Sequence, residues 1–320
     1  MSLKKEKISL LGFGTWGLGS DAYGKITEKQ SLSLIKYSIK KGINFLDTSN
    51  IYGRGLSEKR IGLFLQKNKN LRQKIFIATK CGTKNHSPSK WVMPQNFNVN
   101  YLKNSIKESL NRLNTSYIDL IQLHSPPTKI LNNKFKMKKI LELFLKLKKK
   151  GLIKYIGVSV KSPGDALNIL KNYKSFSFIQ LNFNLIDQRA WDSGILDLAY
   201  KKKIFIISRT PFAFGYLAEN VKLKKNDHRK KWSKKQKSLW SKGRSDFIKL
   251  INRRRFSQIN LALLFATCHP AIKTVIPGMM KINHIIKGLE SLKLKKLTKL
   301  EIRRIRSFYK SNEWVIKKKE

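Results

Sequence analysis

Four residues of the chain, Asp47, Tyr52, Lys80 and His124, have side chains that could act together in proton transfer to a carbonyl oxygen. A free tyrosine has a pKa of about 10 and is a poor acid at neutral pH, but a nearby ammonium group lowers that pKa. Lys80 could supply the ammonium, and Asp47 could supply the counter-charge that a partly buried lysine needs. His124 could hydrogen-bond the carbonyl oxygen and orient it. These residue types therefore predict a general acid, a cation that tunes it, an anchor for the cation and an orienting group.

The positions of these residues matter more than their types. Asp47, Lys80 and His124 each close a short apolar run, and Tyr52 follows Asp47 by five residues. Each residue alone has an ordinary explanation, since a strand-end aspartate is usually a cap, a single histidine is usually structural, and lysine is abundant here. Their joint placement at the ends of three predicted strands carries the hypothesis.

Short apolar runs alternate with longer amphipathic segments along the chain. The runs are rich in Ile, Phe, Val and Leu and are bounded by Gly, Pro, Ser or Asn, which is typical of buried parallel strands. The predicted strands are residues 10–14, 44–48, 75–80, 118–124, 155–159, 178–182, 204–208 and 274–277.

Apolar residues recur at helical spacing between these runs. Eight strand–helix units predict an α/β fold, a (β/α)8 TIM barrel with additional C-terminal helices, and 320 residues fit one such domain over residues 1–320. Active residues of such barrels lie at the C-terminal ends of the strands, where Asp47, Lys80 and His124 are expected. The predicted helices are residues 28–41, 58–66, 99–113, 137–150, 163–173 and 193–203, with two more within 281–309.

A doubly wound open sheet is the structural alternative. That fold would need a glycine-rich phosphate turn between an early strand and a helix. The early glycine run, residues 12–19, lacks the G-x-G-x-x-G spacing, and no regular helix is expected before residue 28. The open sheet is therefore disfavoured.

One lysine-rich segment, residues 212–242, lies outside the repeat and contains Trp232 and Trp240. We expect this segment to be a long loop. Connections of this length are usually either functional or disordered.

Seven motifs resemble those of the aldo/keto reductase family, in family order and over nearly the whole chain. Each motif alone is weak, but the ordered set is specific. The motifs are Gly12-Phe13-Gly14-Thr15-Trp16, Asp47-Thr48-Ser49-Asn50-Ile51-Tyr52-Gly53, Ile77-Ala78-Thr79-Lys80, Leu123-His124-Ser125-Pro126, Ile156-Gly157-Val158-Ser159, Gln180-Leu181-Asn182-Phe183-Asn184 and Val275-Ile276-Pro277-Gly278.

The resemblance implies a nicotinamide cofactor bound without a Rossmann domain and hydride transfer to the carbonyl of an aldehyde, ketone or sugar. Tyr52 is then the general acid, Ser159 and Gln180 meet the nicotinamide carboxamide, and Arg209 stacks on the nicotinamide where many relatives have tyrosine. The loop 212–242, with Asn226 to Arg229 and Trp232, would fold over the cofactor, although a solvated loop is an equal alternative. The implied cofactor-binding residues are Thr15, Trp16, Ser159, Gln180, Arg209, Pro211, Gly278, Met280, Lys281 and His284.

The adenosine end departs from the family pattern. Val160 follows Ser159 where many relatives carry a polar residue, and Met280 stands where the family often has arginine. Lys281 is adjacent, at the predicted start of a helix, whose N-terminus favours an anion. We therefore expect NADPH to be preferred, with NADH as the alternative.

The chain is strongly basic, with 68 Lys and Arg against 19 Asp and Glu and a formal net charge of +49. This charge could indicate a polyanion-binding protein. The basic clusters recur along the whole chain, so we expect no specific nucleic-acid partner and only weak, salt-sensitive binding.

The remaining composition predicts a cytoplasmic protein without membrane or metal sites. No apolar run approaches the length of a membrane span or signal peptide, and Cys81 and Cys268 fit no metal or redox spacing. A non-catalytic cofactor-binding subunit of the same fold is the functional alternative. The substrate depends on loops near Trp16, Trp91 and residues 212–216, and neither it nor the oligomeric state can be predicted.

Overall fold

The computed structural model describes residues 7–85, 93–223, 227–251 and 255–314. Eight parallel strands form one sheet in chain order, which confirms the predicted (β/α)8 fold. The two ends of the sheet meet, because Leu11 pairs with Val275 and Gly14 pairs with Gly278. The strands are β1 Phe13–Gly14, β2 Phe45–Asp47, β3 Phe76–Cys81, β4 Ile118–His124, β5 Ile153–Ser159, β6 Phe178–Asn182, β7 Phe205–Arg209 and β8 Ile272–Ile276.

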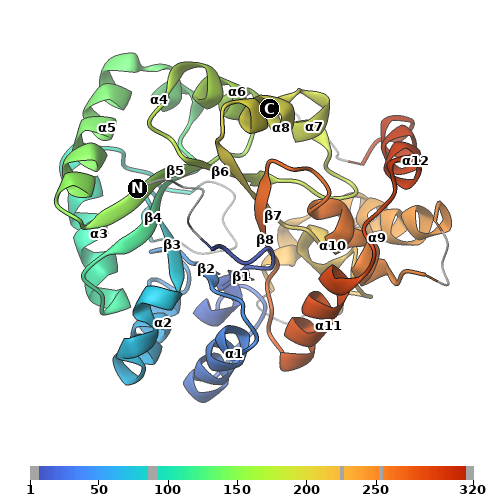
Figure 1. Cartoon of the computed structure of the whole chain (residues 1–320), viewed down its shortest axis with the longest axis horizontal. Coiled ribbons are helices and arrows are strands. Elements are labelled where there is room, and N and C mark those ends of the chain that lie inside the picture. Colours follow the sequence, from blue (N-terminus) through green and yellow to red (C-terminus); the bar gives the residue numbers. More distant parts are fainter. Residues whose placement is uncertain (1–6, 86–92, 224–226, 252–254, 315–320) are drawn as a thin grey trace.

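Helices surround this ring of strands (Figure 1). Helix α1 contacts α11, so the first and last parts of the ring are neighbours. None of the described helices combines the length and the apolar character needed to cross a bilayer. The helices are α1 Glu28–Lys40, α2 Leu56–Lys67, α3 Val99–Leu113, α4 Thr128–Asn132, α5 Lys134–Lys149, α6 Pro163–Asn172, α7 Arg189–Asp192, α8 Ile195–Lys201, α9 Lys234–Lys249, α10 Gln258–Ala266, α11 Ile282–Lys293 and α12 Lys299–Lys310.

Each predicted helix is present, with its ends shifted by a few residues except in α3, and the helix predicted over 193–203 is α8. The short helix α7, which was not predicted, precedes α8, and Gly194 with a φ of +71° lies between the two. Glycine adopts this left-handed conformation without the steric cost that other residues incur, so it ends one helix and starts the next.

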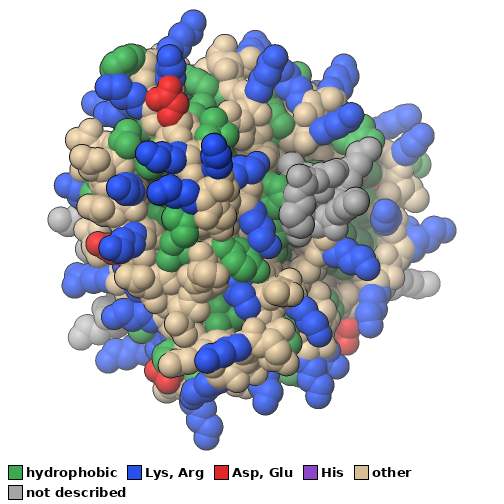
Figure 2. All heavy atoms as spheres, turned by 60° about the vertical axis from the view of Figure 1, so that its left-hand side comes forward, with side chains coloured by type: hydrophobic (Ala, Val, Ile, Leu, Met, Phe, Trp, Pro, Cys, Tyr) green, Lys and Arg blue, Asp and Glu red, His purple; other side chains and the backbone are tan. Residues whose placement is uncertain are grey.

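The predicted loop over residues 212–242 is wrong at its C-terminal end, because α9 begins at Lys234. Ser233 caps this helix by accepting a hydrogen bond from the backbone N–H of Gln236. Trp240, Gly243 and Phe247 are buried at helical spacing. Lysines occupy many of the other positions of α9, and they make the sequence look like a polar loop. Lys and Arg side chains are similarly spread over the whole face drawn in Figure 2.

The barrel interior changes from apolar to polar along the strands. Phe45, Phe76 and Phe178 pack against one another at the N-terminal end, with ring centroids 5.3 Å apart for Phe45–Phe76 and 5.9 Å for Phe76–Phe178. Successive side chains of a strand alternate between faces. Asp47, two residues after Phe45, and Lys80, four after Phe76, therefore share the inward face. Apolar packing below the polar groups keeps water away from them.

Helix α2 follows the Tyr52 loop and packs closely on α3. A Cβ atom at Gly62 would lie 2.1 Å from the backbone oxygen of Arg112. Only glycine permits this approach of the two helices.

We predict that Gly62→Ala lowers the free energy of unfolding by about 1 to 3 kcal/mol, as overpacking of a close contact does. Urea unfolding followed by circular dichroism measures this. The matched control is Gly164→Ala in α6, where the nearest atom to a new Cβ is Ser162 Oγ at 3.9 Å. The control should be neutral or slightly stabilising. Equal effects of the two substitutions would contradict the packing account.

Candidate active site

A cavity of about 730 Å³ lies where the strands end. It is lined by residues at or just after the C-terminal ends of the strands, including Asp47, Tyr52, His124, Gln180 and Arg209. A cavity of this size fits an organic ligand with several polar groups.

Lys80 and Asp47 form a buried ion pair beside the cavity. Lys80 Nζ lies 2.9 Å from Asp47 Oδ1 and 2.8 Å from Oδ2, and it also donates to the Thr48 carbonyl at 2.8 Å. Their side chains are only 1% and 3% exposed. A buried charge requires such complete pairing, so the ammonium is held in one place.

Tyr52 meets this pair from the loop after β2. Its hydroxyl lies 3.3 Å from Lys80 Nζ. The loop has little freedom, because Gly53 adopts a φ of +59° and a Cβ there would lie 2.2 Å from the Gly19 oxygen. The Gly53 N–H also donates to Asp21 Oδ2 at 3.1 Å. Tight contact with the turn after β1 therefore fixes the phenol next to the ammonium.

Two opposing influences act on the pKa of Tyr52. Burial raises this pKa above its usual value, and the Lys80 ammonium opposes the rise by charge attraction and hydrogen bonding. Burial disfavours the charged form of Lys80, but Asp47 and Tyr52 together raise the pKa of its ammonium above the usual value. Lys80 is therefore a permanent cation at neutral pH, and Tyr52 is a protonated phenol.

His124 faces Tyr52 across the cavity. The two rings are perpendicular, with centroids 6.4 Å apart and an interplanar angle of 84°. Its Nδ1 lies 3.2 Å from the hydroxyl of Ser49. All four residues singled out from the sequence are thus gathered at one site.

Two glutamines complete the surroundings of Asp47. Gln180 was expected at the site from the sequence, whereas Gln122 was not. Gln180 Nε2 donates to Asp47 Oδ1 at 2.7 Å, and Gln122 Nε2 approaches the same oxygen at 3.4 Å. Gln122 precedes His124 by two residues on β4, so strand alternation was the signal that could have identified it.

The residues predicted to bind a cofactor separate into two groups. Trp16, Gln180, Arg209, Pro211 and Gly278 line the cavity. The rest lie outside its lining, and they are Thr15, Ser159, Met280, Lys281 and His284.

Unused polar atoms at two strand ends suit a polar ligand. Among the described residues, Ser159 Oγ and Arg209 Nε are buried without a hydrogen-bond partner. Arg209 Nη2 donates to the Val160 carbonyl at 2.9 Å, which fixes the guanidinium at the end of β7. The Thr15 hydroxyl is already engaged, because it donates to the backbone oxygen of Asp47 at 2.8 Å.

The residues after β8 surround the N-terminus of α11. Lys281 is exposed at the N-cap, while the Met280 side chain packs against Gly17. His284 Nδ1 accepts from the Met280 N–H at 3.3 Å. Burial lowers the pKa of His284, and Lys281 lowers it further, so Lys281 is the cation of this group at neutral pH.

The segment after β7 reaches the loop after β1. The backbone N–H and Nδ1 of His228 both contact the Ala22 oxygen, at 3.2 and 3.0 Å. Phe214 packs on His228 with ring centroids 5.5 Å apart. This segment thus forms one wall of the cavity. Trp91 and Asn226, which the sequence analysis placed near the substrate and cofactor, lie outside the described residues.

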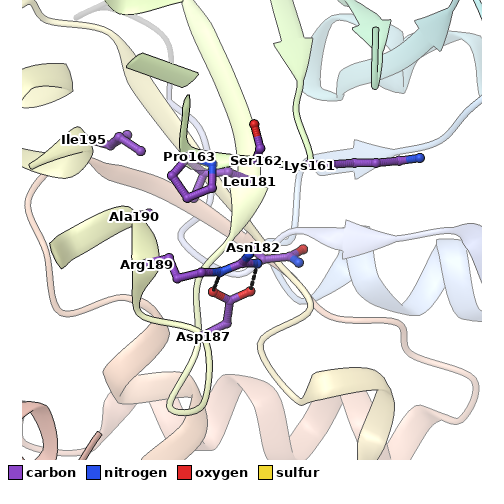
Figure 3. A pocket seen from close by; sticks show the side chains of 9 residues that line it. All are labelled: Lys161, Ser162, Pro163, Leu181, Asn182, Asp187, Arg189, Ala190 and Ile195. Atoms are coloured by element: carbon purple, nitrogen blue, oxygen red, sulfur yellow. Dashed lines mark hydrogen bonds and ion pairs between the residues drawn. The ribbon is translucent and has the colours of Figure 1, made fainter. Parts of the chain in front are cut away.

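A small pocket of about 20 Å³ adjoins the cavity beside β6 (Figure 3). Asp187 and Arg189 point toward each other there and form a two-pronged ion pair at 2.7 and 2.8 Å. Lys161 points away from this pair. Burial, together with the nearby Arg209, lowers the pKa of Lys161. The positive potential of this rim therefore comes from Lys161 and Arg209, since Asp187 balances Arg189.

No group of three or more His, Cys, Asp or Glu suited to a metal ion occurs among residues 7–85, 93–223, 227–251 and 255–314.

Comparison with known proteins gives a consistent result. A model of the aldo/keto reductase family matches residues 10–310. The uncharacterized oxidoreductase YqkF of Bacillus subtilis (strain 168) is 32% identical over 317 residues, which cover 95% of this chain and 94% of that protein. The L-galactose dehydrogenase of Arabidopsis thaliana is 26% identical over 317 residues, with 96% and 93% covered.

Two solved structures are similar over most of their length. An aldo-keto reductase from Bacillus halodurans in its holo form is 26% identical, with a TM-score of 0.77 and coverage of 96% of this chain and 94% of that chain. A glycerol dehydrogenase from Gluconobacter oxydans is 22% identical, with a TM-score of 0.78 and coverage of 98% and 95%, a likeness of fold alone.

We predict that Lys80→Met lowers the free energy of unfolding by about 3 to 5 kcal/mol, because it leaves the Asp47 carboxylate buried without its counter-charge. The double variant Asp47→Asn/Lys80→Met should recover at least about 1 kcal/mol of this loss, since the effects on stability of substituting two contacting residues are not additive. Urea unfolding of the four proteins in the cycle measures the coupling. Strictly additive effects of the two substitutions would contradict the pairing.

Proposed function

Since the chain belongs to the aldo/keto reductase family and is an NAD(P)H-dependent oxidoreductase, we propose that it reduces the carbonyl group of an aldehyde, ketone or sugar with Tyr52 as the general acid. The observation that carries this proposal is the position of Lys80 Nζ, in contact with both Asp47 and the Tyr52 hydroxyl. A regulatory subunit that only binds cofactor would not need a buried cation beside a phenol hydroxyl.

Tyr52 supplies the proton. Burial keeps the phenol protonated before the reaction, so its hydroxyl can donate to the carbonyl oxygen of a substrate. As that oxygen gains electrons, the Tyr52 O–H bond breaks and the proton moves to it. The Lys80 ammonium then stabilises the phenolate that is left, and Asp47 keeps the ammonium in place.

His124 orients the carbonyl group. When the Ser49 hydroxyl donates to His124 Nδ1, the ring carries its proton on Nε2. That N–H can donate to the same carbonyl oxygen as Tyr52. Two donors on one oxygen fix its position and polarise the carbonyl bond.

The bound nicotinamide dinucleotide would supply the hydride that reduces the carbonyl carbon. Ser159 Oγ and Arg209 Nε are buried polar atoms in need of partners, which fits a polar ring with a carboxamide. Gln180, Pro211 and Gly278 line the adjoining cavity, as does Trp16. Thr15 would act through its bond to Asp47 rather than by direct contact.

NADPH is the proposed form of the cofactor. The N-terminus of α11 offers free amide groups and a favourable dipole for a phosphate. Lys281 adds a positive charge at that point, with Met280 and His284 beside it. His284 adds hydrogen bonding rather than charge, because its pKa is lowered.

The substrate class stays broad in this proposal. The name of one similar protein, an L-galactose dehydrogenase, favours a sugar or another polyhydroxylated carbonyl compound. A small-molecule carbonyl is the proposed partner. We also propose a cytoplasmic location, which agrees with Cys81 and Cys268 being free thiols.

We predict that Tyr52→Phe lowers kcat for reduction about 10²- to 10⁴-fold, the usual contribution of a positioned acid. The dissociation constant of the cofactor should change little, because the hydroxyl contacts Lys80 rather than the cofactor-binding residues. Loss of reduced-nicotinamide absorbance over a panel of carbonyl compounds measures turnover, and fluorescence titration measures cofactor binding. Near wild-type turnover in this variant would refute the assignment of the acid.

We predict that wild type binds NADPH more tightly than NADH and that Lys281→Ala lowers this preference about two- to tenfold, as removal of one exposed charge–phosphate contact should. The dissociation constants of both cofactors measure the ratio. Lys287→Ala is the matched control, since it removes an exposed lysine further along α11 and should leave the ratio unchanged. Equal affinities in wild type, or an unchanged ratio in Lys281→Ala, would eliminate the phosphate role.

A further inference from the structure

His228 lies in the cavity wall near the reacting groups, within the loop segment expected from the sequence to fold over the cofactor. Its ring centroid is 4.4 Å from that of Trp16. Trp16 in turn stacks on Tyr52, with centroids 5.9 Å apart and an interplanar angle of 29°. All three residues line the same cavity. The ring of Trp16 therefore lies between the imidazole and the phenol of the proposed acid, in the wall of the cavity.

The contacts of His228 fix which of its nitrogens carries the proton. Its Nδ1 lies 3.0 Å from the backbone oxygen of Ala22, and its backbone N–H reaches the same oxygen at 3.2 Å. A carbonyl oxygen only accepts hydrogen bonds, so Nδ1 must hold the proton. In the neutral ring, Nε2 is then an acceptor with a lone pair.

That acceptor is unused by the protein. Nε2 of His228 is buried, and within the described parts of the chain it has no hydrogen-bond partner. Leaving a buried acceptor unsatisfied costs free energy, which a bound donor would recover. The adjacent ring of Tyr23 lies 4.8 Å away and is perpendicular to the imidazole, so it packs beside this acceptor.

The groups around His228 keep it neutral. Burial lowers its pKa to about 4, against the opposing effects of the Ala22 hydrogen bond and Asp227, while Lys231 and Arg229 lower it further. The Asp227 carboxylate is held by Arg229 through bonds of 2.8 and 2.6 Å. The acceptor is therefore present throughout the neutral range of pH.

We propose that His228 Nε2 accepts a hydrogen bond from a hydroxyl group of the substrate and so selects hydroxylated aldehydes and ketones over plain alkyl carbonyl compounds. This inference rests on the proposed reductase function. An uncharged hydroxyl fits better than an ammonium donor, because the cations Lys161, Arg209 and Lys231 line the same cavity. The faces of Trp16 and Tyr23 can pack on the carbon chain of such a substrate.

The test compares two three-carbon aldehydes, glyceraldehyde and propanal, in wild type and in His228→Phe. Phenylalanine keeps the ring that packs on Trp16 and removes both nitrogens. We expect the ratio of kcat/KM values, glyceraldehyde over propanal and corrected for free aldehyde, to fall about two- to tenfold in the variant, as the loss of one hydrogen bond predicts. The value of kcat/KM for propanal should stay near that of wild type.

A merely structural role of His228 gives a different result. His228→Phe also breaks the bond to Ala22, and if holding that loop were its only role, kcat/KM would fall equally for both aldehydes. That result, or an unchanged ratio, would overturn the proposal. His269→Phe is the matched control, because His269 is a buried histidine that bonds Asp197 and the Ala271 N–H outside the cavity lining. Its ratio should equal that of wild type.

A binding experiment separates this inference from the proposed reductase function. The ¹⁵N resonance of His228 Nε2 is followed in the NADPH-loaded protein during addition of ethylene glycol or of its dimethyl ether, which has no O–H donor. We expect a shift with the glycol alone. A shift without turnover of any carbonyl compound would reject the reductase function and keep the hydroxyl site, whereas turnover without a shift or a change in ratio would reject the hydroxyl site.

Discussion

A lysine ammonium inside the barrel is stable only because a carboxylate lies directly beside it. Asp47 accepts two contacts from Lys80 and another from Gln180, so its charge is balanced and its oxygens are occupied. An unpaired charge at this depth would be strongly destabilising. The positions of Asp47 and Lys80 relative to each other are therefore maintained by the stability of the fold itself. The aromatic side chains packed below the pair, among them Phe45 and Phe76, keep water away from it and hold the two charged groups in one position. The polar side chains above these aromatic rings are arranged around the fixed positive charge of Lys80.

The proposed function depends on two opposing influences on the pKa of Tyr52, burial and the positive charge of Lys80. A buried phenol holds its proton, and a neighbouring ammonium stabilises the phenolate, so Tyr52 is protonated at rest and able to donate when negative charge develops nearby. The loops restrict this chemistry to one geometry, because Gly53 packs on Gly19 and His228 joins the segment after β7 to Ala22. The cavity is thus closed on one side by residues that contribute polar atoms as well as shape.

The barrel and the four central residues could be predicted because their signals are local. Short apolar runs that end at Lys80 and at His124 predict buried parallel strands, and the carboxyl ends of such strands place both residues at the same rim. Gln122 was within reach of the same reasoning, being two residues from His124. The sequence placed His228 in a loop expected near the cofactor, but not the role of its ring, because its decisive contact joins residues 206 positions apart, and no local pattern encodes a contact across the barrel mouth. The first part of helix α9, up to residue 242, was predicted as a loop because its many lysines concealed the helical spacing of its buried residues, which tertiary packing fixes.

The central claim is that Lys80 lowers the pKa of a buried Tyr52 phenol, and the most direct test measures that pKa. A fluorinated tyrosine at position 52, more acidic than tyrosine, brings the titration into a range where the protein stays folded, and ¹⁹F NMR follows its ionisation in wild type and in Lys80→Met. Removal of a cation in contact with the hydroxyl should raise the pKa at position 52 by about 1 to 3 pH units. Equal pKa values in the two folded proteins would contradict the account.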